Sequence, residues 1–70
     1  MKPFKGPIFC WEKLYFDNSL IPESLGYHIF GYRHPLLKKL GIARLTSAVV
    51  FHDEPTNRVE TLNSWYQLVD

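Results

Sequence analysis

The sequence predicts an α+β fold: a small antiparallel β-sheet of about four to five short strands that ends in a β-hairpin, with one short helix near residues 35–40. Two patterns support this prediction. Segments rich in β-branched and aromatic residues alternate with clusters of Pro, Gly, Asn and Asp, as expected of strands joined by turns. The clearest helix pattern is a short segment of leucines and lysines between a proline and a glycine.

The strongest strand signal is the C-terminal hairpin. Residues 45–52 are rich in β-branched and aromatic side chains, which pack well on a pleated sheet. Residues 53–57 contain a proline, which fixes φ, and Asn57, which tolerates the left-handed region. The chain is therefore expected to reverse there and to pair residues 58–62 with the preceding strand.

A third C-terminal strand is expected after a second interruption at residues 63 and 64. Side chains alternate between the two faces of a strand, so Val59 and Thr61 share one face. Tyr66 and Leu68 can resume that face if a bulge or tight turn intervenes. We therefore predict a short final strand.

The N-terminal half is expected to supply two further strands. Residues 1–7 contain two prolines and a glycine, which predicts a flexible N-terminal arm, with residues 8–70 as a single small globular domain. Residues 8–16 are apolar and rich in rings, and residues 27–33 alternate, which favours strands. Gly31 in the second segment suggests a bend or the close approach of another backbone.

The helix is expected to begin at Pro35 and to end before Gly41. Its leucines can face inward together, while its lysines point to solvent near the negative end of the helix dipole. A helix this short is unstable alone, so we expect packing against the sheet to hold it. The residues expected to face inward are Leu36, Leu37 and Leu40.

The core must rest on apolar packing, much of it aromatic. Eleven of the 70 residues are Phe, Tyr or Trp, and each ring can bury about 150–250 Å². The single cysteine, Cys10, lies in an apolar segment, so we expect it in the core. The sequence shows no long apolar run of the kind found in signal peptides or membrane spans, so we expect a cytoplasmic protein with no membrane partner.

Charge is distributed unevenly, although the formal net charge is only +1. No acidic residue occurs from Ser24 to His52, whereas the stretch from Asp53 to Asp70 has a balance of −3. The first stretch predicts a basic face for electrostatic steering or nucleic-acid contact; an ordinary solvated helix face is the alternative. The predicted basic face consists of Tyr32, Arg33, Lys38, Lys39 and Arg44.

No residue pattern predicts catalysis or metal binding. His28, His34 and His52 lack the short spacing typical of metal ligands. Asp53 and Glu54 are adjacent carboxylates, but they lie in a predicted turn, where local hydrogen bonding and solvation favour acidic residues. We therefore expect no catalytic residue, no metal and no cofactor, and a protein that is not an enzyme.

The aromatic N-terminal segment is the predicted partner-binding site. Phe4, Ile8, Phe9 and Trp11 lie beside prolines and far in sequence from the hairpin, which suggests an edge strand. The unpaired backbone of such a strand, together with its apolar side chains, invites strand addition by a partner segment. The alternative is that Trp11 belongs to the core.

Over its whole length, the chain resembles the small transcription regulators that lytic phages of plant-pathogenic bacteria make to bind the host RNA polymerase. The resemblance rests on length, on the order of the segments and on three stretches: MKPFKGPIFCW (residues 1–11), TSAVV (46–50) and VETLNSWYQL (59–68). It implies a non-enzymatic inhibitor in the host bacterial cytoplasm. Such an inhibitor engages the large polymerase subunits, disfavours the sigma-bound initiation complex and allows read-through of terminators.

Two functions therefore compete. In the first, the chain is a partner-binding regulator whose rings anchor it and whose charge steers it. In the second, it is a small nucleic-acid-binding module whose basic residues contact phosphates of RNA or DNA while Tyr32 stacks on a base. A polymerase-bound regulator could also touch RNA. In either case we expect the free protein to be a monomer.

Overall fold

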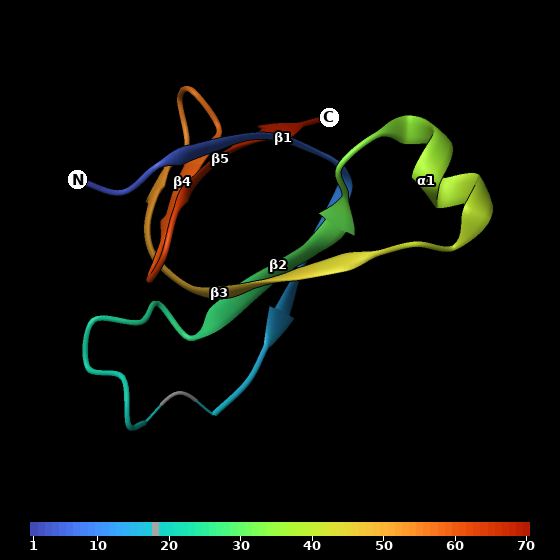
Figure 1. Ribbon diagram of the computed structural model, residues 1–70. Helices are drawn as coiled ribbons and strands as arrows, with labels where there is room; N and C mark the ends of the chain where they lie inside the picture. Colours follow the sequence, from blue (N-terminus) through green and yellow to red (C-terminus); the bar gives the residue numbers. More distant parts are fainter. Residues whose placement is uncertain (18) are drawn as a thin grey trace.

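The chain folds into a closed barrel of five strands, each paired with the next strand along the sequence. The computed structural model describes residues 1–17 and 19–70. Figure 1 shows the strands as a ring, with one short helix projecting from it. The elements are β1 (Phe4–Tyr15), β2 (Tyr27–Tyr32), α1 (Pro35–Leu40), β3 (Arg44–Asp53), β4 (Arg58–Thr61) and β5 (Trp65–Val69).

The first and last strands close the barrel by pairing in parallel. Pro7 lies opposite Gln67, and Ile8 lies opposite Leu68. The four pairs of consecutive strands are antiparallel. Strand direction alternates along such a chain, so in a ring with an odd number of strands the first and last must run the same way.

The predicted antiparallel sheet with one short helix is confirmed in outline, but the fold is mostly β. The prediction of an edge position for the first strand is wrong.

The N-terminal residues belong to the barrel. β1 begins at Phe4, so the predicted arm is wrong for residues 4–7. The Trp65 N–H donates to the Pro3 carbonyl at 2.8 Å, and the Lys2 ammonium contacts a Glu60 carboxylate oxygen at 2.6 Å. A strand tolerates this glycine and these prolines because Gly6 adopts a φ of 97° and the pairing with β5 shifts register between Phe4 and Pro7.

The core fills the interior of the barrel. Every strand contributes at least one buried apolar side chain to it, while side chains that point the other way face outward. Trp11 and Tyr66 are partly buried and pack against this cluster. The buried apolar cluster consists of Ile8, Tyr27, Ile29, Val49, Val59 and Leu68.

A tight turn joins β4 to β5, and the side chain of Leu68 in β5 points into the barrel as those of Val59 and Thr61 in β4 do. The Thr61 side chain is fully buried, and its hydroxyl accepts from the Ser64 N–H and donates to the Ser64 carbonyl, both at 3.1 Å. The Thr61 hydroxyl thus has both a donor and an acceptor partner in the Ser64 backbone, which offsets the cost of burying this polar group. The predicted interruption at residues 63 and 64 and the return of Leu68 to the core are confirmed.

The predicted hairpin is also confirmed, with β3 and β4 joined through residues 53–57. Asp53 lies opposite Arg58, and Asn57 adopts a left-handed φ of 58°. The Thr56 hydroxyl donates to an Asp53 carboxylate oxygen at 2.7 Å. The acidic side chain at the start of the turn therefore has a structural role.

Gly31 lies where β2 passes close to β1. A Cβ at this position would lie 2.5 Å from Ile8 Cγ2, 3.0 Å from the Phe9 carbonyl oxygen and 3.1 Å from Trp11 Cα. β1 bulges there, between Phe9 and Glu12. The bulge turns Cys10 outward with a φ of 52°, so the prediction of a core cysteine is wrong.

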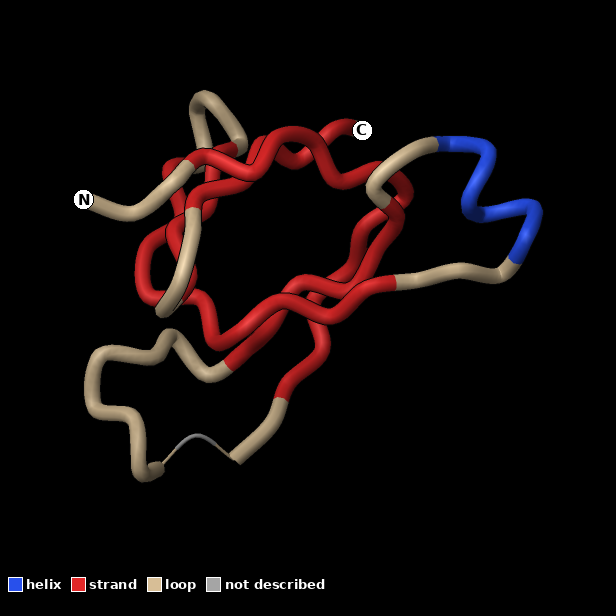
Figure 2. The backbone as a smooth tube through the Cα atoms, in the orientation of Figure 1, coloured by secondary structure: helices blue, strands red, loops and turns tan. Residues whose placement is uncertain are grey.

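The helix has the predicted limits but not the predicted packing. The Leu36 N–H donates to His34 Nδ1 at 3.1 Å, and Gly41 ends the helix with a left-handed φ of 71°. However, no α1 residue is buried, and the exposed fractions of Leu36 and Leu40 are 59% and 69%. Strand side chains already fill the barrel, so α1 stands outside it (Figure 2). No helix in residues 1–17 and 19–70 is long and apolar enough to cross a membrane.

We predict that Gly31→Ala destabilises the fold by about 1–3 kcal/mol, because the added methyl group meets backbone atoms of β1 that cannot rotate away. Urea unfolding measures this loss. Gly41→Ala is a comparison without crowding: its Cβ meets nothing within 4 Å, so its expected loss of about 1–2 kcal/mol comes from the left-handed φ alone. A Gly31→Ala variant as stable as the wild type would contradict the close packing of β1 on β2.

Candidate functional site

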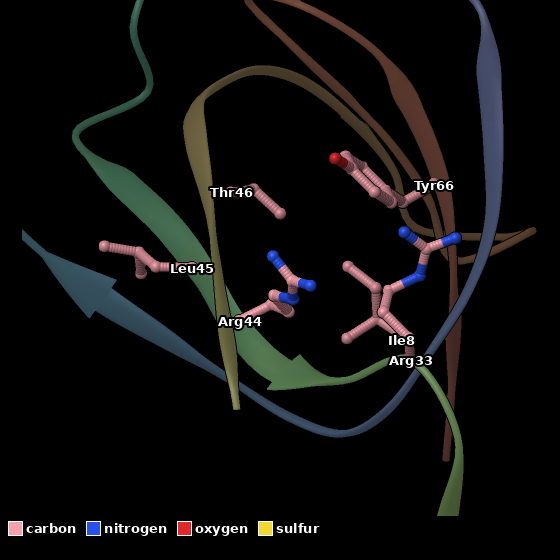
Figure 3. A pocket seen from close by; sticks show the side chains of 6 residues that line it. All are labelled: Ile8, Arg33, Arg44, Leu45, Thr46 and Tyr66. Carbon is pink, nitrogen blue, oxygen red and sulfur yellow. The ribbon is translucent and has the colours of Figure 1, made fainter. Parts of the chain in front are cut away.

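Two arginines of the predicted basic face meet at one pocket. Arg33 follows β2 and Arg44 begins β3, and the two strands pair at this end through Gly31 and Arg44. The helix α1 connects them, so the pocket lies where α1 leaves the barrel. Its volume is about 280 Å³. We call it the arginine pocket; it is lined by Ile8, Arg33, Arg44, Leu45, Thr46 and Tyr66 (Figure 3).

Arg33 is held in place by the first strand. Its Nε–H donates to the Pro7 carbonyl at 3.3 Å, and Nη2 donates to the Lys5 carbonyl. The guanidinium carbon lies 5.7 Å from the centre of the Tyr66 ring, within the range of a cation–π contact. These contacts orient the Arg33 side chain and bring it to β5.

Arg44 has no such partners. Its side chain makes no hydrogen bond or ion pair with any residue of the described part of the chain, where the Lys2–Glu60 contact is the one ion pair. In Figure 3 the guanidinium of Arg44 points into the pocket near Thr46, and the Ile8 side chain is drawn between it and the Arg33 guanidinium, whereas Leu45 points outward at the margin. The pocket therefore combines two positive charges with a lining of mixed polarity and no described counter-ion.

The other members of the predicted basic face lie elsewhere. Lys38 and Lys39 are exposed on α1 and do not line the pocket. Tyr32 is half-buried, and its ring packs edge-on against Phe30 at 6.5 Å. The structure thus divides the predicted face into an arginine pair and a helix that carries lysines.

The exposed side of α1 is apolar as well as basic. Ile42, just after the helix, is also 47% exposed. Apolar side chains interspersed with lysines and left uncovered by the rest of the chain are typical of surfaces that bind a partner. We call this set the α1 surface; it consists of Leu36, Lys38, Lys39, Leu40 and Ile42.

The predicted N-terminal site does not form one surface. Ile8 is only 3% exposed and belongs to the core, so its assignment to the partner-binding site is wrong. Phe9 is half-buried and its ring lies 6.5 Å from that of His34. Phe4 is 54% exposed under the Arg58 guanidinium, beside a second pocket of about 290 Å³. Register shifts in β1 between Phe4 and Pro7 and between Phe9 and Glu12 interrupt the alternation and send these side chains in different directions.

Trp11 joins the barrel to the C-terminus. Its indole N–H donates to Asp70 Oδ1 at 3.1 Å, and Asn57 Nδ2 donates to Asp70 Oδ2 at 3.3 Å. The carbonyl oxygen of the same Asn57 amide lies 3.0 Å from His52 Nε2, and His52 Nδ1 lies 2.9 Å from the Tyr27 hydroxyl. Trp11 thus packs against the buried apolar cluster and also bonds to the C-terminal residue Asp70. No sequence spacing could have indicated this network, because its members come from five separate segments.

The histidines likewise take part in the fold. His28 Nδ1 lies 2.8 Å from the Thr46 carbonyl oxygen, His34 caps α1, and His52 lies in the network of Trp11. In residues 1–17 and 19–70, no group of three or more His, Cys, Asp or Glu could hold a metal ion.

No protein-family model, curated protein or solved structure matches the chain.

We predict that Tyr27→Phe removes part of the alkaline loss of stability. Burial raises the pKa of Tyr27 above its ordinary value of 10.0, and the neighbouring Tyr15 and Glu54 add to the shift. The unfolded phenol therefore ionises first, so the wild type loses stability as the pH rises from 10 toward the raised pKa. The variant lacks this loss, but at neutral pH it is about 1 kcal/mol less stable because His52 loses a hydrogen bond.

Urea unfolding at a series of pH values from neutral to alkaline measures both effects. Tyr32→Phe is the matched control, since it removes a half-buried phenol that makes no hydrogen bond with the described residues; it should keep the alkaline loss of the wild type. Identical pH profiles for Tyr27→Phe and the wild type would refute the argument.

Proposed function

We propose that the protein is a non-enzymatic transcription regulator that binds the large subunits of bacterial RNA polymerase in the host cytoplasm. In this proposal it inhibits initiation by disfavouring the sigma-bound complex, and it allows transcription to continue through terminators. The class of partner comes from the whole-chain resemblance to phage transcription regulators. The mode of action as a binding protein is supported by the exposed α1 surface.

The observation that carries the proposal is the α1 surface. A helix of six residues is not stable by itself in water, and α1 buries none of its residues against the barrel. Its apolar side chains would be better placed against another protein, where burying each leucine contributes about 1.5–3 kcal/mol. A partner that covers α1 would thus supply the packing that the barrel does not.

Charge supports the same assignment. Lys38 and Lys39 are exposed beside the leucines, and no acidic residue lies between Ser24 and His52 to neutralise them in the sequence. Exposed charges at the rim of an interface act mainly on association rate and orientation. The lysines would guide the chain to an acidic region of a much larger assembly, and the leucines would then hold it there.

A second candidate is direct binding of nucleic acid, favoured by the meeting of Arg33 and Arg44 at one pocket. Arginine is well suited to phosphate recognition, and a regulator on the polymerase would lie near RNA. Two features weigh against it as the main activity. Tyr32, the ring expected to stack on a base, packs on Phe30, and the net charge is only +1.

We predict that a tagged full-length chain recovers polymerase subunits from bacterial lysate at low salt, and that Leu36→Ser with Leu40→Ser reduces recovery at least about tenfold. Leu20→Ser with Leu25→Ser is the matched control, because it removes two exposed leucines from the loop between β1 and β2. The control should recover as much polymerase as the wild type, and both variants should keep its melting temperature.

Two outcomes would contradict the proposal. If the wild type recovers no polymerase subunits, the assignment of the partner is wrong. If recovery disappears after nuclease treatment of the lysate, nucleic acid links the two, and the second candidate is the better account.

A further inference from the structure

The arginine pocket has the construction of a binding site for an anionic group. Arg33 is fixed by the carbonyls of Lys5 and Pro7, and its guanidinium carries more N–H donors than these two acceptors use. A donor that is already oriented loses little conformational freedom when a ligand binds. One side of the pocket is therefore preorganised.

Arg44 supplies the second side. Its guanidinium points into the same hollow and is not paired with any described carboxylate. Two cations that face one small space repel each other, and an anion placed between them would turn this repulsion into two charge-assisted contacts. Arg44 is also exposed, so a ligand can reach it from solvent.

The walls of the pocket favour a carboxylate on a protein over the phosphates of a nucleic acid. The Tyr66 ring and the largely buried Ile8 side chain lie beside the arginines, and Leu45 is exposed at the margin of the pocket. A nucleic-acid backbone is normally followed by a continuous basic groove with exposed rings. Here Lys38 and Lys39 do not line the pocket, and the α1 surface beyond it is largely apolar.

We propose that the arginine pocket receives an aspartate or glutamate side chain from an acidic segment of a partner protein that also carries apolar residues. The acidic side chain enters between Arg33 and Arg44, and the apolar residues lie against Leu45 and the α1 surface. Arg33 and Arg44 flank α1 in the chain, so one short segment can reach both places. The proposal rests on the proposed function only in taking polymerase as the source of this segment.

A pair of blocked synthetic peptides tests the pocket without polymerase. One alternates leucine with aspartate, and the other has asparagine in place of each aspartate. In nitrogen-15 spectra of the full chain, the aspartate peptide should shift the side-chain Nε–H signals of Arg33 and Arg44, and the asparagine peptide should not. Arg44→Gln should raise the dissociation constant of the aspartate peptide at least about tenfold.

Two further variants serve as controls. Arg44→Lys keeps the charge but loses the planar fork, so its dissociation constant should lie between those of the wild type and Arg44→Gln. Arg58→Gln removes an arginine from the second pocket and should bind the peptide like the wild type. The melting temperature should not fall in Arg44→Gln, because the Arg44 side chain makes no hydrogen bond or ion pair with the described residues and its removal relieves the repulsion between the two guanidinium groups.

Three results would overturn the inference: equal binding of the two peptides, unchanged binding by Arg44→Gln, or displacement of the aspartate peptide by single-stranded RNA that itself binds more tightly. The last result would identify a phosphate site instead.

The experiments also separate failure of this site from failure of the proposed function. If the wild type binds the aspartate peptide through Arg44 but recovers no polymerase, the anion site is correct and the proposed partner is wrong. If the wild type recovers polymerase but does not bind the peptide, the proposed partner is correct and the anion site is wrong.

Discussion

The parallel pairing of β1 with β5 is the constraint on which the rest of the structure depends. It leaves no free edge in the sheet and lets alternate side chains of all five strands fill the interior. Because the interior is full, α1 has no groove to occupy and remains outside with Leu36 and Leu40 exposed and Leu37 half-buried. The same closure brings Tyr66 of β5 beside Arg33 and so builds one wall of the arginine pocket. The candidate surface is thus a consequence of how the barrel closes.

Local elements of the fold were predictable because their causes lie within a few residues. The turn after β3 follows from Pro55 and Asn57, and the limits of α1 follow from Pro35 and Gly41. The closure was not predictable, because parallel contacts between residues near positions 8 and 68 leave no local pattern. The same contacts explain the error about the N-terminal arm: its prolines and glycine suit a bulged strand whose partner lies at the other end of the chain.

The candidate site shows a similar division. An unusual distribution of charge indicated that residues 24–52 were of interest, and this was sufficient to select Arg33 and Arg44. It could not show that these two converge while Lys38 and Lys39 remain apart, since that separation depends on the path of α1 between β2 and β3. The expected edge position of the first strand placed Ile8 in the interface, whereas the closed barrel buries its side chain.

Amide hydrogen exchange of the free protein tests the central claim most directly, because it reports which backbone groups are held in a closed sheet. The account predicts that the amide of Trp65 in β5, which donates to the Pro3 carbonyl beside β1, exchanges about as slowly as the amides of β3, whereas amides of α1 exchange much faster. Rapid exchange at Trp65, with slow exchange in β3, would mean that β5 does not pair with the N-terminal strand and that the barrel is open. Slow exchange throughout α1 would contradict the claim that this helix lacks a partner in the free protein.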